Sequence, residues 1–431
     1  MPTPSLPHPN PEHSPRQRRV RLFQLLGVTA IVFLGLASVQ RTSGQEGMPK
    51  AVAVTKGPEH HFFGYYDKCP WDKTGRYLLT NESSFVDRQP KKGELLRVGM
   101  IDLKNNNKLT VIGTTPAWCW QQGTMLQWLG SGPDRQVIHN SVDNDKYISV
   151  ITDIKTGKVT RLPLPIYALS TDGTQAVSLD FARLGRLRPG YGYVALPEKF
   201  KNDPAPKELG VWWMDVETKQ HKLIVSLNQL SKIRPKSSFR GASHWVNHLL
   251  FNPSGTRILF LHRWGIPGKR WETRLYTVNP DGSDLSLVVD TGRVSHFDWK
   301  DDTTILAWSQ TKKDGRHFYL FEDKTGKATV FMPKALPRDG HCSYSPDRRW
   351  LLNDTYPDEL RLQTLMLIRL KDNKRFDVGR YYLPPQLRGP FRCDLHPRWN
   401  RDGTKVCFDS AHEGTRQMYV VDVSSWIKKK Q

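Results

Sequence analysis

One stretch decides the fold: Gly340-His341-Cys342-Ser343-Tyr344-Ser345-Pro346-Asp347-Arg348-Arg349-Trp350-Leu351-Leu352. It combines a polar-tipped strand, a tight Ser-Pro-Asp turn and an apolar strand, which is the pattern of a β-hairpin. The same pattern recurs at residues 70–79, 127–140, 170–173, 252–255, 298–306 and 400–403. The chain therefore contains seven hairpin units.

Each hairpin is followed by a weaker pattern of an alternating strand, a polar turn and a further strand, as at Trp213-Met214-Asp215-Val216. Seven four-stranded units at a spacing of roughly 40 to 80 residues predict an all-β, seven-bladed β-propeller. No helical period of comparable length competes with this pattern. The last unit is one strand short, so Ala51-Val52-Ala53-Val54 is expected to complete it and close the ring.

The sequence carries a strong positive charge. Its 431 residues include 64 lysines and arginines against 42 aspartates and glutamates, a formal net charge of +22. This balance favours a polyanionic partner: nucleic acid, an acidic lipid surface or an acidic polysaccharide. The basic residues are spread along the chain, and no basic helix or nucleic-acid motif is present. Five scattered cysteines do not form a disulfide framework.

The N-terminal region has the composition of an export segment. Residues 1–19 are predicted to be disordered and basic, and the uncharged apolar run in 20–39 is either a signal peptide or a membrane anchor. Residues 40–50 form a polar linker, 51–426 the propeller and 427–431 a basic tail. In either case the propeller is expected outside the cytoplasm, in the periplasm or the extracellular space, as a monomer.

Aligning the hairpins on their turns brings a histidine to one register in four adjacent units: His248, His296, His341 and His396. Neutral imidazole is the commonest transition-metal ligand, so this register predicts a divalent metal site in the channel. Cys393 and His244 are further candidate ligands, and a cysteine favours zinc over manganese or calcium. The alternative is a ring of histidines that bond one another, carbonyls or substrate without a metal.

Polar and aromatic residues that can bind sugars occur on strands expected near the ring axis. Aromatic rings stack on sugar faces, and imidazoles, amides and guanidinium groups bond hydroxyls or carboxylates. The candidates are His61, Tyr65, Gln122, His139, Asn140, Tyr167, Arg183, Tyr191 and Arg263. Packing between blades and structural hydrogen bonds are the competing interpretations. Residues 184–193 are expected to form a loop over one mouth of the ring.

The chain resembles the seven-bladed propeller polysaccharide lyases, in particular ulvan lyases and, more distantly, oligogalacturonate lyases. The likeness covers roughly residues 51–426 and rests on the seven-unit ring together with three further features. They are the His61-Phe62-Phe63-Gly64-Tyr65-Tyr66-Asp67 opening, the spacing of Tyr167 and Arg183, and the histidines of the later blades. The resemblance implies β-elimination at a uronic acid of an acidic polysaccharide, with Tyr167 and Arg183 in the active site and a metal ion elsewhere in the ring.

The chemistry needs a cation for the uronate carboxylate, a base for the C5 proton and an acid for the leaving oxygen. Arg183 suits the carboxylate, and Tyr167 can move a proton with His139 or His61 as its partner. The metal would either lock the later blades or act as a Lewis acid.

One departure from the resemblance matters. Where such lyases have two histidines before the tyrosine, this chain has Gln121 or Gln122 and then His139 or Asn140. Either His139 fills one role, or the proton-transfer groups differ, or the protein no longer cleaves. A non-catalytic propeller that binds acidic glycans or envelope proteins is therefore the alternative function. A metal-dependent hydrolase would need carboxylates close to the ion, for which Asp394 and Asp298 are the candidates.

Overall fold

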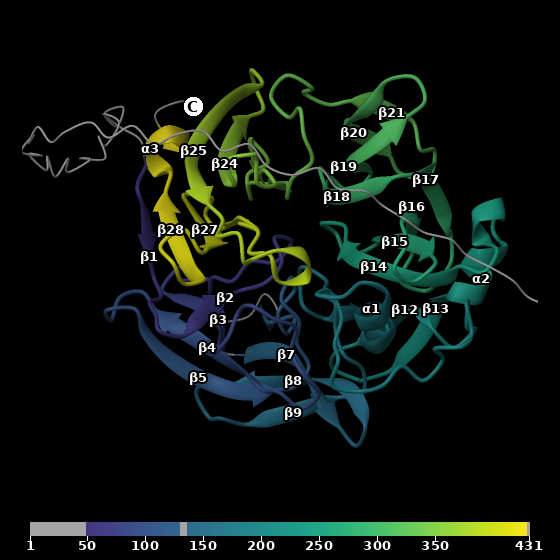
Figure 1. The fold of residues 1–431 in the computed structure, drawn as a ribbon, viewed down its shortest axis with the longest axis horizontal. Helices are drawn as coiled ribbons and strands as arrows, with labels where there is room; N and C mark the ends of the chain where they lie inside the picture. The colour runs from purple at the N-terminus through teal and green to yellow at the C-terminus, as the bar shows by residue number, and fades with distance from the viewer. Residues whose placement is uncertain (1–48, 130–135, 429–431) are drawn as a thin grey trace, which may run out of the picture. The chain divides into compact units, whose positions relative to one another are not determined.

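The computed structural model describes residues 49–129 and 136–428 of the chain. These residues form seven four-stranded antiparallel sheets arranged as the blades of a ring (Figure 1). The predicted all-β, seven-bladed propeller is thus confirmed. The predicted segments 1–19 and 20–39, most of the linker and residues 429–431 lie outside the described residues. Within the described ranges, no helix is long and apolar enough to cross a membrane.

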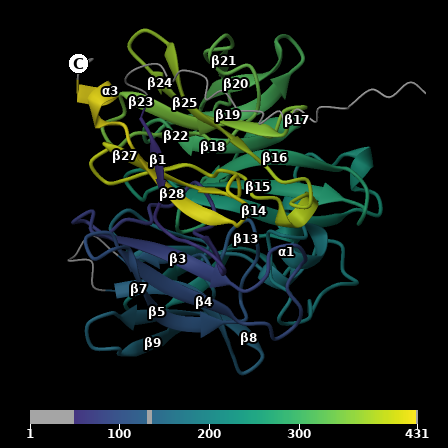
Figure 2. The same ribbon diagram turned by 60° about the vertical axis from the view of Figure 1, so that its left-hand side comes forward.

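The blades follow one another in chain order. Blade 1 contains β2 (His60–Phe62), β3 (Tyr77–Ser83), β4 (Leu96–Asp102) and β5 (Lys108–Thr115). Blade 2 contains β6 (Gln127–Trp128), β7 (Gln136–Asp143), β8 (Lys146–Asp153) and β9 (Val159–Leu162). Blade 3 contains β10 (Ala168–Leu169), β11 (Gln175–Ser178), β12 (Gly210–Asp215) and β13 (His221–Ser226). Blades 1 and 2 lie next to one another in Figure 1 and in the turned view of Figure 2.

The later blades have the same plan. Blade 4 contains β14 (Ser243–Phe251), β15 (Ile258–Gly265), β16 (Trp271–Val278) and β17 (Ser286–Gly292). Blade 5 contains β18 (Val294–Trp299), β19 (Thr304–Thr311), β20 (Gly315–Glu322) and β21 (Ala328–Val330). Blade 6 contains β22 (Ser343–Tyr344), β23 (Trp350–Asp354), β24 (Leu362–Arg369) and β25 (Lys374–Tyr382). Blade 7 contains β26 (Arg398–Trp399), β27 (Lys405–Ser410), β28 (Gln417–Asp422) and β1 (Ala51–Ala53).

The first and last strands belong to the same blade. β1 pairs antiparallel with β28, and Ala51 stands opposite Val421. The N-terminal strand therefore supplies the fourth strand of blade 7. The short helix α3 (Ser424–Lys428) crosses the predicted boundary at residue 426, because the buried Ile427 packs in the core of this region.

The blades are held together by packing between neighbouring sheets. Strand β24 shows the rule: Leu365 and Leu367 pack in one apolar cluster with Val406 of blade 7. The intervening Met366 and Ile368 pack in another cluster with blade 5. Successive side chains of a strand point to opposite faces, so an all-apolar strand buries both faces. The ring thereby gives every blade two neighbours.

A buried histidine pair behind the channel should make the propeller sensitive to acid. His244 of β14 and His262 of β15 lie with Nδ1 and Nε2 2.9 Å apart. Burial, followed by the charges of Arg183 and Arg274, lowers the pKa of His244 to about 4. Burial also holds the pKa of His262 well below its usual value. The unfolded chain therefore takes up protons at a higher pH than the folded one.

We expect the unfolding free energy to be highest above pH 6.5 and to decrease as the pH falls from 6.5 toward 4. His244 alone accounts for up to roughly 3 kcal/mol of this loss. Denaturant unfolding at pH 7.5, 6 and 5 measures it. His244→Gln, which keeps a neutral polar side chain, should flatten the pH dependence relative to His221→Gln at an exposed position. Equal slopes for both variants would show that His244 does not contribute.

Candidate functional site

Four histidines surround one aromatic side chain of blade 1. The ring centroid of Tyr65 lies 4.8 Å from that of His248, 6.4 Å from His296, 5.9 Å from His341 and 4.9 Å from His396. All five side chains are buried. The aligned register thus brings the four imidazoles together around Tyr65, and His248 also contacts His296, with ring centroids 6.4 Å apart.

Backbone geometry helps to aim two of these side chains. His248 and His396 have positive φ angles of 51° and 42°, which are uncommon for residues other than glycine. The pairing of β14 with β15 shifts between Asn247 and Leu250, so His248 sits in a β-bulge. Bulges and left-handed residues re-aim side chains and are frequent at functional sites.

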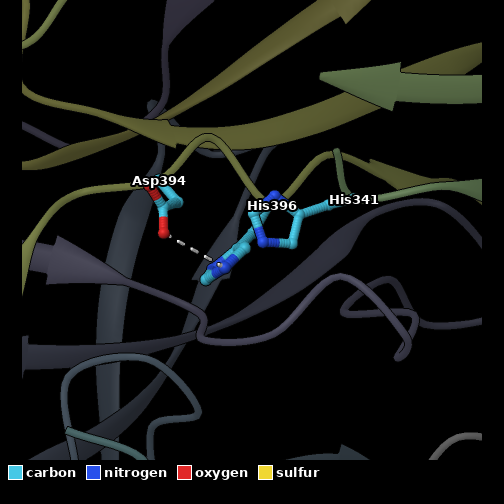
Figure 3. Close-up of side chains that lie close together, drawn as sticks. All are labelled: His341, Asp394 and His396. Carbon is cyan, nitrogen blue, oxygen red and sulfur yellow. Dashed lines mark ion pairs between the residues drawn. The ribbon is translucent and has the colours of Figure 1, made fainter. Parts of the chain in front are cut away.

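His341, Asp394 and His396 form a group that can hold a metal ion (Figure 3). Their candidate ligand atoms all lie within 4.8 Å of one another. The Nε2 atoms of both histidines are buried and have no hydrogen-bond partner among the described residues. The carboxylate of Asp394 lies 4.0 Å from Nε2 of His396. Two unpartnered imidazole nitrogens and a carboxylate in one buried place fit a divalent cation.

The surrounding residues orient these ligands. Asp354 accepts from Nδ1 of His341 at 2.9 Å, and the carbonyl of Gly64 lies 2.8 Å from Nδ1 of His396. Both Nε2 lone pairs are thereby presented inward. Burial opposes ionisation of Asp394, but Arg392, which donates to it at 2.5 and 2.7 Å, outweighs burial and lowers its pKa. Asp394 is therefore a carboxylate at neutral pH.

The metal-binding group differs from the predicted ligand set. His296 adjoins it, with its ring centroid 4.2 Å from that of His341, but its Nδ1 faces Asp339 at 2.9 Å and its Nε2 lies 3.4 Å from the Tyr356 hydroxyl. The ring centroid of His248 lies 6.4 Å from that of His296. Cys393 packs against Leu383, Leu387 and Ala411 instead, and burial raises the pKa of its thiol to about 12. Without a cysteine in the group, the preference for zinc over manganese loses its basis.

From the sequence, Asp394 is a candidate carboxylate close to the ion only for the hydrolase alternative and is not among the predicted ligands. The structure places it with His341 and His396, whereas the neighbouring Cys393 packs in another cluster.

A buried cationic site lies near Tyr65. Arg263 of β15 is only 5% exposed, and its Nε and Nη1 have no hydrogen-bond partner among the described residues. The Nε of Arg188 is likewise unpartnered. Burial and then the charge of Arg188 lower the pKa of Arg263 to about 10, opposed by the nearby Tyr65, Tyr191 and Tyr167. A buried guanidinium with free donors is a binding site for an anion, above all a carboxylate.

Tyr167 and His248 form the polar wall of this site. The Tyr167 hydroxyl lies 3.1 Å from Nδ1 of His248 and accepts a hydrogen bond from the Gln122 amide. Burial raises the pKa of Tyr167 well above its usual value, so it holds its proton. Burial and Arg263 hold the pKa of His248 well below its usual value, so this imidazole is neutral. His248 is therefore the partner of Tyr167, a contact that the sequence interpretation missed.

Arg183 does not contact this wall. It lies in α1 (Phe181–Leu187), a helix capped by Asp180, where the sequence interpretation placed a strand end and a loop. Its five N–H bonds point to protein acceptors, which are Glu198 and the carbonyls of His244, Phe200, Asp203 and Pro204. A substrate carboxylate would have to displace one of them. Arg263, in contrast, has two N–H groups without a partner among the described residues, and these could bind a substrate carboxylate.

The remaining candidates divide between the site and the blade interfaces. Tyr191 reaches the site, with its ring centroid 6.2 Å from Tyr65. Asn140 instead binds the backbone of Ile166 and the Tyr193 hydroxyl. His139 faces its neighbour's carbonyl and the sheet of blade 1 near Gly113.

His61 also lies at a blade interface. Its Nε2 and Nδ1 face Glu82 and Gln417, each at 3.0 Å. Neither His139 nor His61 has a hydrogen bond to Tyr167 in the described structure.

Solved structures with this fold include two lyases. The chain resembles an oligogalacturonate lyase in complex with manganese at 15% identity and a TM-score of 0.62, over 87% of this chain and 93% of that one. An oligogalacturonate lyase from Vibrio parahaemolyticus gives 14% identity and a TM-score of 0.61, over 87% and 94%. A prolyl endopeptidase structure gives 11% identity and a TM-score of 0.51, over 85% of this chain and 48% of that one.

No protein-family model and no curated protein matches the chain. Structural likeness at such low identity establishes a shared propeller fold. This is the fold of oligogalacturonate lyases, whereas the resemblance to ulvan lyases stays a prediction.

Proposed function

We propose that the protein is an exported lyase that cleaves a uronic-acid-containing acidic glycan by β-elimination and uses a divalent metal ion. One observation carries the proposal. Arg263, a buried cation with two N–H groups that lack a partner among the described residues, lies near the neutral imidazole of His248 and the protonated Tyr167. His248 stacks on Tyr65, which also contacts the two histidines of the metal-binding group. A carboxylate-binding group, a base and an acid are the parts that elimination at a uronate needs.

The residues have the following roles. Arg263 binds the uronate carboxylate through Nε and Nη1. The Tyr65 hydroxyl lies 3.3 Å from Nε2 of His248, and the substrate displaces it there. Nε2 then removes the C5 proton, the electron pair of that bond forms the C4–C5 double bond, and the C4–O bond breaks. Tyr167 gives its proton to the leaving oxygen. The proton taken by His248 then returns to Tyr167 through the Nδ1 contact, and exchange with solvent restores the starting tautomer.

A metal ion bound by His341, Asp394 and His396 would withdraw electron density from the substrate carboxylate and make the C5 proton more acidic. Donor chemistry of two imidazoles and a carboxylate suits manganese as well as zinc. The manganese complex of one structural neighbour supports a test with manganese first.

Ultraviolet absorbance tests the reaction class. The full-length protein, loaded with Mn²⁺, is incubated with oligogalacturonates, ulvan and glycosaminoglycans. We expect absorbance to rise for one member of this panel, because elimination creates a double bond conjugated with the carboxylate. A flat trace for every member, with the protein folded and metal-loaded, would favour the non-catalytic glycan-binding propeller.

A further inference from the structure

A cavity lies between blades 4 and 5, next to the candidate lyase site described above. Its volume is about 540 Å³, within the range of about 300 to 1,000 Å³ found for ligand pockets. Its walls come from both blades and from the segment that carries Asp339. The lining residues that matter here are Arg270, Trp271, Arg293, Trp308, Arg316 and Asp339.

The cavity is rich in arginine that is available for a ligand. Arg270, Arg293 and Arg316 are all exposed and have no carboxylate partner among the described residues. Arg316 donates to the amide oxygen of Gln310 at 3.3 Å. Two acids, Asp339 and Glu272, also line the cavity, and Asp339 faces His296. The three arginines outnumber these two acids. The remaining charge is positive and selects an anion.

The cavity also offers aromatic surface. Trp271 is 37% exposed, and Trp308 is half-buried. An exposed indole face beside a guanidinium suits a charged sugar, because the ring stacks on the sugar while the cation binds its carboxylate. Among the described residues, no histidine, tyrosine or cysteine lines this cavity.

Two contacts join the cavity to the lyase site. The Trp271 ring lies 4.5 Å from the guanidinium carbon of Arg188 and 5.9 Å from that of Arg263. On the other side, Asp339 lies 2.9 Å from Nδ1 of His296, which adjoins the metal-binding group. A glycan whose uronate is held by Arg263 can therefore continue over Trp271 into the cavity.

We propose that this cavity binds a third anionic sugar of the same glycan, beyond the two that share the cleaved bond, so that the preferred substrate carries charged sugars on both sides of Trp271. The inference rests on the proposed lyase function and adds a substrate class, an oligomer with repeated carboxylates, to it. The cavity then sets chain-length preference without taking part in the chemistry.

Digalacturonate and trigalacturonate test the proposal. We expect kcat/KM of the full-length, Mn²⁺-loaded protein to be at least tenfold higher for the trimer. The double variant Arg293→Gln/Arg316→Gln should lower the trimer value by about ten- to a hundredfold and leave the dimer value within twofold. The control Arg161→Gln/Arg349→Gln removes the same charge at exposed positions outside the cavity and should change neither. Equal losses for dimer and trimer, or no loss for either, would overturn the cavity's role.

Calorimetric titration of the same sugars separates the two proposals. Trimer binding that is weakened only by the cavity variant, without elimination of any substrate, supports the cavity and contradicts the lyase. Elimination with equal efficiency on dimer and trimer, insensitive to the cavity variant, supports the lyase and contradicts the cavity. Failure to bind either sugar overturns the cavity proposal.

Discussion

Arg263→Met is expected to abolish turnover and, at the same time, to stabilise the protein. Arg263 is a buried cation whose Nε and Nη1 have no partner in the part of the chain that the structure describes, and burial lowers its pKa to about 10. Methionine of similar length removes a desolvated charge, a change that raises the unfolding free energy by about 1 to 4 kcal/mol in comparable sites. Loss of two charged hydrogen bonds to the substrate carboxylate should lower kcat/KM by about a thousandfold.

The matched control is Arg257→Met. Arg257 is also buried, but it donates to Asp323, Asn279 and Thr277. Its removal leaves the buried Asp323 without its cation and should cost about 3 to 5 kcal/mol of stability. Denaturant unfolding and the elimination assay measure both variants. A destabilised Arg263→Met protein, or one with unchanged turnover, would contradict the assignment of Arg263 as a carboxylate-binding residue.

His396→Ala is expected to remove the metal site. Its Nε2 is one of the two imidazole nitrogens in this group that are buried and have no hydrogen-bond partner among the described residues, and Asp394 and His341 alone offer too few ligands. The wild-type melting temperature should rise with Mn²⁺ concentration, because only the folded state holds the three ligands together. The variant should lose this dependence, and its elimination rate should fall by about a thousandfold, as expected for several kcal/mol of lost charge stabilisation.

His221→Ala, at an exposed position of β13, provides the control and should keep the Mn²⁺ dependence. Metal content after dialysis gives an independent readout of the same site. If His396→Ala binds manganese as tightly as the wild type, the ion lies elsewhere. If it loses the ion and keeps its turnover, the ion is structural.

Only part of the candidate site could be predicted from the sequence, because the histidines of the later blades and the residues around Arg263 leave different signals. The histidine register repeats with the hairpins, so an alignment of the units within one chain finds His296, His341 and His396 together. Arg263 and Tyr167 were named from their residue types, but their relation to His248 depends on a contact between blades 3 and 4 that no local pattern records. The acceptors of Arg183 come from residues 198–204 and 244, which only folding brings to it.

The sequence by itself determined the architecture, because strand alternation and turn chemistry are local and repeat seven times. It also determined that an unpaired N-terminal strand was left to complete the last blade. Only the tertiary structure decided which buried polar side chains keep hydrogen-bonding groups that have no partner among the described residues. Burial and hydrogen bonding separate the fully bonded Arg183 from the unpartnered Arg263, and the inert Cys393 from Asp394. These differences arise between residues far apart in the chain, so packing decides them.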